Sequence, residues 1–339
     1  MDAKHTDCTV LRLSVFVVFL LFPLHCSYAI YNITSSQALS QGQNLTSLSQ
    51  IFELGFVRPN NSGNQYVGIW YKQTSPQTVI WVTNRDNHLA VTDSLASLII
   101  DSNGNLNIVD GRKSSVWSTN IGVPSNSSAA VLLDNGNLLL KEGISGEVLW
   151  SSFDHPGNTL VPQSVICFNV KTGVRQVLTS WKSENEPSLG NFTVGISLQS
   201  PPQAFIWVNG STPYWRTGPW DRIKFIGVPD MESSYISAIK LDEDKGMGAN
   251  NFTFVPLLSK SSYYLFISSE GVLKVMQKDE DQDYWYINWE GPKSKCGVYG
   301  VCGPFAVSKA SDSLVCNCLK GLYQNQMKSG AKETGKEGA

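Results

Sequence analysis

Histidine and long apolar runs are scarce in this chain, and each scarcity excludes a class of function. Only 4 of the 339 residues are histidine, and His88 and His155 are the ones that lie beyond residue 30. Both stand in turn-forming sequence, so we expect them to stabilise turns rather than to transfer protons. The acidic run at 279–283 reads as an exposed charged segment rather than a catalytic carboxylate pair. The sequence therefore predicts no enzyme, no cofactor and no metal site.

An excess of one charge sign is also missing. The 26 Lys and Arg residues offset 28 Asp and Glu residues, which leaves no electrostatic footprint for nucleic acid or an anionic membrane. Beyond residue 30, no apolar stretch approaches the ~20 residues that a membrane-spanning helix needs. We therefore expect no nucleic-acid partner and no membrane span, and a protein that is released rather than anchored.

One apolar run does occur, at the N-terminus. Lys4 and Arg12 precede a mostly apolar run from Leu13 to Leu24, which is followed by the small residues Ser27 and Ala29. This pattern is typical of a signal peptide, and the run is too short to cross a bilayer core of ~30 Å. We expect cleavage near Ala29 and a secreted, extracellular protein.

Sequons support export. Seven Asn-x-Ser/Thr triplets occur, where the composition predicts roughly four by chance. We expect N-glycans on exposed turns. The acceptor residues are Asn32, Asn44, Asn60, Asn126, Asn191, Asn209 and Asn251.

Short apolar runs separated by Gly, Asn, Asp and Ser predict an all-β fold from residue 31 onward. Two related segments contain Asn103-Gly104 and Asn135-Gly136, and each Asn-Gly pair predicts a hairpin with a type I′ turn. These units end at Trp117 and Trp150, and an earlier unit ends at Trp81. We expect three small sheets around one axis, with a tryptophan from each at the shared centre, which makes a prism.

A looser copy of this pattern follows between residues 153 and 290. A Glu270-Gly271 turn precedes an apolar strand and then Trp285 and Trp289. We hypothesise a second, more divergent β domain of related architecture. Beyond Leu322 the chain is polar and rich in Lys, Gly and Glu, so we expect a disordered tail.

Seven strings stand in order along the chain: Glu53-Leu-Gly-Phe56, Gly68-Ile-Trp-Tyr-Lys72, Trp81-Val-Thr-Asn-Arg-Asp86, Leu132-Leu-Asp-Asn-Gly-Asn-Leu138, Trp150-Ser-Ser-Phe-Asp-His-Pro156, Leu178-Thr-Ser-Trp-Lys182 and Tyr214-Trp-Arg-Thr-Gly-Pro-Trp220. From about residue 31 to 322 the chain thereby resembles the extracellular region of plant S-locus glycoproteins and G-type lectin S-receptor-like kinases. The resemblance implies a bulb-type lectin β-prism (30–152), a second lectin-like S-locus glycoprotein domain (153–290) and a partial EGF-like module (291–322). The residue patterns described above predict the signal peptide (1–29) before them and the disordered tail (323–339) after them.

Mannose-binding lectins of the bulb type resemble one another in a motif Gln-x-Asp-x-Asn-x-Val-x-Tyr, whose alternate side chains face one side of a strand and bind sugar hydroxyls. The corresponding positions here are Asp101, Asn103, Asn105, Asn107 and Val109, and then Leu133, Asn135, Asn137, Leu139 and Lys141. Only the central asparagine is retained in both units. We therefore favour a turn role for the Asn-Gly pairs over a working mannose pocket. The candidate carbohydrate-binding residues are Asp101, Asn103, Asn105, Asn107, Asn135 and Asn137.

Five cysteines lie beyond residue 30, an odd number for a secreted chain. In the EGF-like module that the resemblance implies, the first cysteine pairs with the third, the second with the fourth and the fifth with the sixth. Ser308 occupies the third position, and the sixth would lie beyond the family-like sequence. By this pairing only Cys302 and Cys316 can form a disulfide, which leaves Cys296 and Cys318 without partners and predicts a loosened module. Cys167 is interpreted as a small buried apolar residue.

The resemblance implies an extracellular recognition protein for pollen-recognition or defence signalling. Its partner would be a polypeptide ligand, such as a small cysteine-rich peptide, or a cell-wall glycan, and the ectodomain would dimerise with itself or with a related receptor. No Gly-rich phosphate loop or catalytic-loop motif is present, so the family's kinase is not expected in this chain. The alternatives are a mannose-binding lectin and a non-functional product of a truncated receptor gene.

Overall fold

The computed structural model describes residues 31–59, 62–122, 127–169, 171–197, 200–228, 239–244, 249–254, 261–308 and 316–318. Strands dominate these residues, which confirms the all-β prediction. The predicted signal peptide and the predicted tail lie outside the described residues. Among the described residues, no helix has the length and apolar character needed to cross a membrane.

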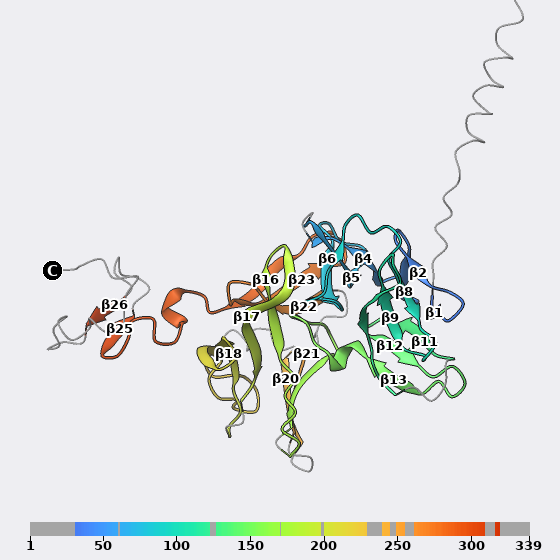
Figure 1. The fold of residues 1–339 in the computed structure, drawn as a ribbon. Helices are drawn as coiled ribbons and strands as arrows, with labels where there is room; N and C mark the ends of the chain where they lie inside the picture. The colour runs from blue at the N-terminus through green and yellow to red at the C-terminus, as the bar shows by residue number, and fades with distance from the viewer. Residues whose placement is uncertain are drawn as a thin grey trace, which may run out of the picture.

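The first half forms a prism of three antiparallel sheets, in which each sheet is built on a three-stranded unit (Figure 1). The first unit comprises β4 (Phe52–Val57), β5 (Asn64–Tyr71) and β6 (Thr78–Val82). The second comprises β8 (Ser97–Ile100), β9 (Leu106–Val109) and β10 (Ser115–Ser118), and the third β11 (Ala129–Leu132), β12 (Leu138–Lys141) and β13 (Val148–Ser151). β7 (Leu89–Ala90) pairs with β5.

Three short N-terminal strands complete the sheets of the first prism in reverse order. β1 (Ile33–Thr34) pairs with β11 of the third unit, and β2 (Leu39–Ser40) pairs with β8 of the second. β3 (Asn44–Thr46) pairs with β4 of the first. The N-terminal segment therefore holds all three faces of the prism together.

The centre of the first prism is the predicted tryptophan cluster. The ring centroids of Trp81 and Trp150 are 6.0 Å apart, and those of Trp117 and Trp150 are 5.9 Å apart. Alternation along the strands adds fully buried residues such as Leu106, Ile108 and Leu138 to the same core. The prediction that each unit contributes one tryptophan to a shared centre is confirmed.

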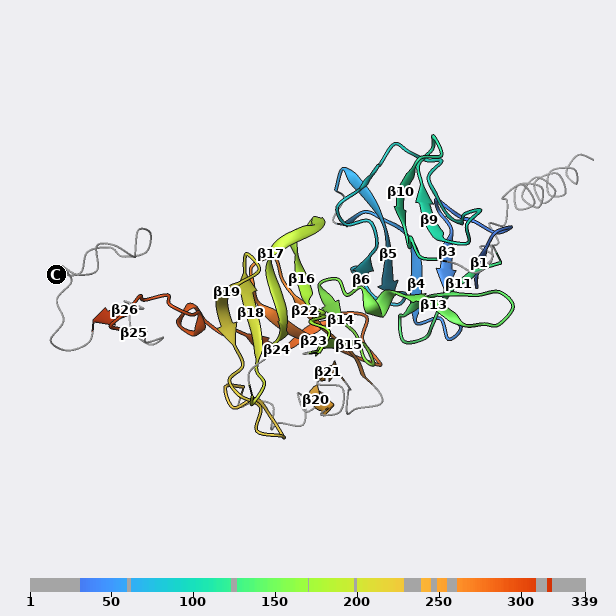
Figure 2. The ribbon, with the colours of Figure 1, turned by 60° about the horizontal axis from the view of Figure 1, so that its bottom comes forward.

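The second half repeats this strand order in a second prism (Figure 2). Its first sheet comprises β16 (Leu178–Ser183), β17 (Glu186–Ile196), β18 (Ala204–Val208) and β19 (Thr212–Arg216). The second comprises β15 (Val165–Asn169), β20 (Ile239–Asp244) and β21 (Ala249–Phe254). The third comprises β14 (Thr159–Leu160), β22 (Ser261–Ile267), β23 (Leu273–Asp279) and β24 (Tyr286–Gly291). β16, β15 and β14 again complete the successive sheets in reverse order. The prediction of a second, related β architecture is confirmed.

The two prisms are linked by partly buried hydrogen bonds. The guanidinium of Arg85, which follows β6, donates to the carbonyl oxygens of Pro187 at 2.6 Å, Thr179 at 3.0 Å and Ser180 at 2.8 Å. Burial lowers the pKa of Arg85 to about 10, so the side chain stays charged at neutral pH. One arginine of the first prism thus fixes the β16–β17 hairpin of the second.

The hairpin turns differ in one respect from the prediction. Gly104 and Gly136 have positive φ angles of 80° and 85°, but Asn103 and Asn135 do not. A type I′ turn would need positive φ at both central residues, so that turn type is wrong. The Gly104 N–H instead donates to the Asp101 carbonyl, in a loop of three residues that ends with a left-handed glycine.

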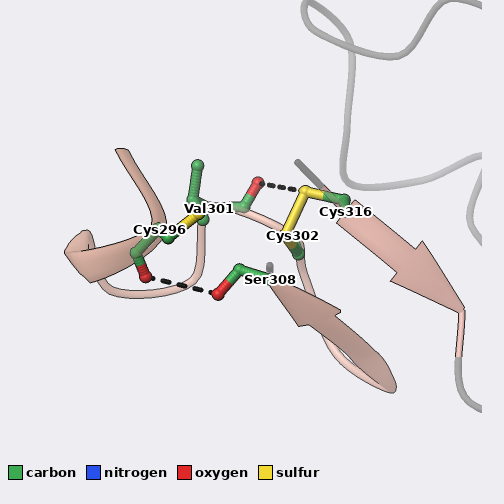
Figure 3. The surroundings of a disulfide bond; sticks show 5 residues. All are labelled: Cys296, Val301, Cys302, Ser308 and Cys316. Atoms are coloured by element: carbon green, nitrogen blue, oxygen red, sulfur yellow. Dashed lines mark hydrogen bonds between the residues drawn. A yellow bond between two sulfur atoms is a disulfide. The ribbon is translucent and has the colours of Figure 1, made fainter. Parts of the chain in front are cut away.

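Beyond the second prism lies a small cysteine-containing segment made of the 3-10 turn η4 (Lys295–Gly297), β25 (Ala306–Ser308) and β26 (Cys316–Cys318). Cys302 and Cys316 form a disulfide with their Cα atoms 5.3 Å apart, which is the pair that the family order implies (Figure 3). The Ser308 hydroxyl lies beside Cys296 and donates to its carbonyl oxygen at 3.3 Å. Cys296 is a free thiol. The EGF-like nature of this segment stays a prediction.

Candidate functional site

The first candidate sugar site is a tightly bonded turn between β8 and β9. One carboxylate oxygen of Asp101 accepts the backbone N–H groups of Asn103 at 2.8 Å and Asn105 at 3.0 Å. Asn103 is exposed at the tip. Asp101 is therefore a turn-forming residue, of the kind in which an Asx side chain binds backbone groups two or more residues ahead.

Asn105, at the centre of the motif, is buried, and its side chain is used inside the protein. Its Oδ1 atom accepts the Thr119 hydroxyl at 2.8 Å and the Ile121 N–H at 2.9 Å. Its Nδ2 atom donates to the Ile121 carbonyl at 3.3 Å. We call this arrangement an asparagine clamp, because Asn105 holds the chain that leaves β10 against the start of β9.

The third unit has the same clamp. The Asn137 Oδ1 atom accepts the Ser152 hydroxyl at 3.0 Å and the Phe153 N–H at 3.3 Å. In both units the clamped hydroxyl also accepts the first N–H of the central strand, from Leu106 to Thr119 at 3.2 Å and from Leu138 to Ser152 at 2.9 Å. The asparagine oxygens that could accept a sugar hydroxyl are thus already occupied.

Of the six candidate residues, Asn103 and Asn107 keep the most hydrogen-bonding capacity. Asn103 makes no side-chain hydrogen bond within the described part of the chain, and Asn107 uses only its Oδ1 atom, which accepts the Ser115 hydroxyl at 2.8 Å. The six residues are not brought to one site, because Asn135 and Asn137 belong to the next face of the prism. Carbohydrate binding by this set stays a prediction.

Asn135 lies beside a hollow of about 450 Å³. Its Nδ2 atom donates to Gln163 Oε1 at 3.3 Å, so the turn of the third unit contacts the loop between β14 and β15. The neighbouring Asp134 accepts the Ser49 N–H at 2.7 Å and the Ser49 hydroxyl at 2.8 Å. These bonds, the backbone one first, hold the pKa of Asp134 below its usual value. The hollow also has buried aromatic walls, from Phe52, Tyr71 and Tyr263.

Only some of the predicted glycosylation sites lie on turns. Asn209 lies in the turn between β18 and β19, and Asn32 precedes β1. Asn44, Asn191 and Asn251 lie within strands, so the expectation that the acceptors sit on turns is wrong for these three. Asn44 and Asn191 are nevertheless exposed, because alternate residues of a strand face outward, whereas Asn251 is half-buried. Asn60 and Asn126 lie outside the described residues, and glycosylation at all seven stays a prediction.

His155 has a structural role, as its turn context predicts. Its ring stacks on Trp150 with centroids 5.2 Å apart, and its carbonyl oxygen accepts the Trp81 indole N–H at 2.9 Å. Asp279 accepts the Ser261 hydroxyl and the Gln277 amide, both at 2.9 Å, and the Gln277 bond contributes most to holding its pKa low. No group of three or more potential metal ligands occurs among the described residues.

Cys167 lies in β15, half-buried, as a free thiol. Burial raises its pKa, with a smaller contribution from Asp154. A thiol with a raised pKa is a poor nucleophile. The prediction that Cys167 is buried is wrong, because its side chain stays partly exposed.

Sequence reasoning missed two functional features of the structure. The Asn84 Oδ1 atom accepts the Val67 N–H at 2.9 Å and so closes the first unit in place of a clamp. Arg85 beside it links the prisms. Both residues stand in the string 81–86, so the signal was present in the sequence. No short-range pattern predicts the Arg85 bonds, because their acceptors lie 94–102 residues farther along the chain.

Comparisons with known proteins identify two kinds of domain. A family model described as a D-mannose binding lectin matches residues 78–182, and one described as an S-locus glycoprotein domain matches residues 215–326. The chain is 41% identical over 308 residues, 91% of its length, to a G-type lectin S-receptor-like serine/threonine-protein kinase of Arabidopsis thaliana. It is 45% identical over 307 residues, again 91% of its length, to another of the same description.

The chain spans 36% of the first of these relatives and 37% of the second. It covers only their lectin and S-locus glycoprotein region, so the kinase activity of the longer proteins is not assigned to it. Among solved structures, the Japanese Marasmius oreades lectin matches 37% of this chain and 92% of its own length with 17% identity and a TM-score of 0.29. The two-domain Scilla campanulata agglutinin matches 78% and 88% with 12% identity and a TM-score of 0.24.

Proposed function

We propose that this chain, a member of the S-locus glycoprotein and G-type lectin S-receptor-like kinase family, is an extracellular recognition module. It binds a polypeptide or a cell-wall glycan through the surfaces of its two prisms and contributes to pollen-recognition or defence-type signalling. Secretion through the N-terminal signal peptide and N-glycosylation belong to the same proposal. So does dimerisation through the ectodomain.

The observation that carries this proposal is the use of the lectin-motif asparagines as clamps. Asn105 and Asn137 accept internal hydroxyl and N–H groups at 2.8–3.3 Å. Freeing such an acceptor for a sugar would leave a partly buried donor unpaired, at a cost of about 1–3 kcal/mol. The family's motif positions therefore support the fold, and recognition falls to other surfaces of the two joined prisms.

The test is binding by the secreted, glycosylated chain, immobilised and probed with a glycan array and with a panel of small secreted cysteine-rich peptides. We expect saturable binding to at least one class, with the Asn103→Ala and Asn107→Ala double variant unchanged. Absence of binding to every member of both panels would contradict the recognition role. Endoglycosidase treatment of the secreted protein should also lower its apparent mass.

The alternative of a mannose-binding lectin has one observation in its favour, which is the free hydrogen-bonding capacity of Asn103 and Asn107. In that case mannose should bind the wild-type chain and not the Asn103→Ala, Asn107→Ala double variant. The same binding experiment therefore separates the two functions.

A further inference from the structure

A groove of about 460 Å³ lies where the two prisms meet, away from the lectin-motif turns. The first prism contributes the end of β4 and the segment leading into β6, including Arg58 and Gln77. The second prism contributes Asn158, which precedes β14, and Trp181 on β16. It also contributes parts of β22, the turn that follows β22, and Lys274 on β23. Neither prism forms this groove alone.

Two contacts between the prisms hold the groove in shape. Arg85 fixes the β16–β17 hairpin to the first prism through three hydrogen bonds of 2.6–3.0 Å. Trp181, on β16, packs against an apolar cluster of the first prism that contains Val57 and Val82. A ligand entering a groove that is already formed loses less free energy to ordering of the protein than one that must assemble its site.

Several groups on the walls have unused binding capacity. Trp181 is half-buried and makes no hydrogen bond through its indole N–H within the described residues. Asn158 accepts the Thr159 hydroxyl at 3.1 Å through Oδ1, while its Nδ2 donors have no partner among the described residues. Arg58 and Lys274 make no salt bridge with a described carboxylate. Donors for a polar ligand therefore surround an aromatic surface.

The mixture of groups favours a saccharide. An indole face packs against the C–H face of a sugar ring, while amide, hydroxyl and charged groups bond its hydroxyls. The basic Arg58 and Lys274 are balanced by the lining carboxylates Glu184 and Glu270, which favours an uncharged ligand. The volume falls within the ~300–1,000 Å³ range of small-ligand sites. We propose that the groove between the prisms binds a neutral oligosaccharide.

This inference rests on the proposed recognition function and names a ligand class and a site for it. The test is isothermal titration of the secreted, glycosylated chain with neutral gluco-, xylo- and manno-oligosaccharides of two to six residues. Trp181→Leu keeps apolar packing but removes the aromatic face, and Lys274→Met removes a donor at a surface position. We expect at least tenfold weaker binding for Trp181→Leu and a smaller loss for Lys274→Met.

The Asn103→Ala, Asn107→Ala double variant is the matched control and should bind with unchanged affinity. Circular dichroism establishes that each variant is folded, and if Trp181→Leu is not, Lys274→Met combined with Gln77→Ala takes its place. Unchanged oligosaccharide affinity in the folded groove variants would overturn the groove proposal. Binding of a peptide and of no oligosaccharide would also overturn it, yet leave the recognition function standing, whereas binding of neither class would overturn both.

Discussion

The two prisms share a strand order but close their hairpins with different residues. In the first prism, Asn105 and Asn137 each clamp a hydroxyl that in turn accepts the first N–H of the central strand. In the second, the Thr217 hydroxyl accepts the Ala204 N–H at 3.0 Å at the equivalent place, but Gln203 stands where the asparagine would be. The hydroxyl-to-strand bond recurs without the lectin asparagine. In the first prism the motif asparagine orients this hydroxyl, so its presence in the sequence is explained by closure of the unit and does not by itself indicate a sugar site.

The cores of the two prisms also differ. Trp81, Trp117 and Trp150 meet at the centre of the first prism. The second is filled by separate aromatic contacts, for example Phe225 with Phe252 at 6.4 Å. A core that depends on one central group should be more sensitive to a single substitution than one with distributed contacts.

Trp150→Ala should have the largest effect on stability. Trp150 contacts both other tryptophans and His155, so truncation opens a cavity at the axis and should lower the free energy of unfolding by about 3–5 kcal/mol. Urea denaturation measures the loss. Hydrogen exchange should show the largest loss of protection in β11–β13.

The control for this substitution is Trp207→Ala in the second prism. Trp207 lies half-buried on β18, where it stacks on Phe205 at 5.2 Å and under Arg175 at 3.8 Å, so its removal should cost only about 1 kcal/mol. Equal losses for Trp150→Ala and Trp207→Ala would contradict the difference between the cores.

Arg85→Met should have the next largest effect, because it separates the two prisms. The variant leaves three carbonyl oxygens of the β16–β17 hairpin without their charged donor, at a cost of about 2–3 kcal/mol. Thermal unfolding followed by calorimetry should then show the prisms melting in two transitions. Arg58→Met, which removes an exposed arginine without a salt bridge to a described carboxylate, should melt like the wild type. A single unshifted transition in Arg85→Met would refute the coupling role.

Much of this fold could be predicted from local sequence. The period-two alternation and the recurring Asn-Gly and Trp positions predict the units of the first prism. Each unit consists of three strands that follow one another in the chain and are joined by short turns. The pairing of β1, β2 and β3 with three different sheets could not be predicted, because each strand is only 2–3 residues long. In addition, β1 and β2 pair with strands far along the chain. The Arg85 contacts are non-local in the same way.

Asn137→Ala should have a moderate effect on stability, and it distinguishes an asparagine in a clamp from one at an exposed turn. The substitution removes the acceptor of the Ser152 hydroxyl and one of the two acceptors of the Phe153 N–H, which keeps the Ser151 hydroxyl oxygen. The free energy of unfolding should therefore fall by about 1–3 kcal/mol. Asn103→Ala, at an exposed turn position, should change it by less than about 0.5 kcal/mol. Chemical denaturation of the two variants gives both changes in the free energy of unfolding. An equal loss in Asn103→Ala and Asn137→Ala would show that the turn asparagine and the clamp asparagine do not differ in their contribution to stability.

The candidate sugar site was harder to predict than the fold, because an asparagine side chain can bind either a sugar or a neighbouring part of the same chain. The spacing of Asn103, Asn105 and Asn107 places their side chains at alternate positions, as a ligand set requires. Spacing does not reveal that Thr119 and Ile121, from the chain beyond the next strand, already occupy the Asn105 oxygen. The groove between the prisms has no local pattern at all, since its residues come from both halves of the chain.

Asp134→Asn should have the smallest effect and tests a contact within the first prism. Asp134, in the turn of the third unit, accepts the N–H and the hydroxyl of Ser49, which precedes β4. The pKa of Asp134 is lowered in the folded state, below its unfolded value of about 3.9. Its stabilisation is therefore complete above that value and is lost as the pH falls through the folded pKa. Because the carboxylate is exposed, solvent screening keeps the effect small. The urea midpoint of the wild type should fall slightly more between pH 6 and pH 2.5 than that of Asp134→Asn. Identical pH profiles would mean that this bond does not stabilise the first prism.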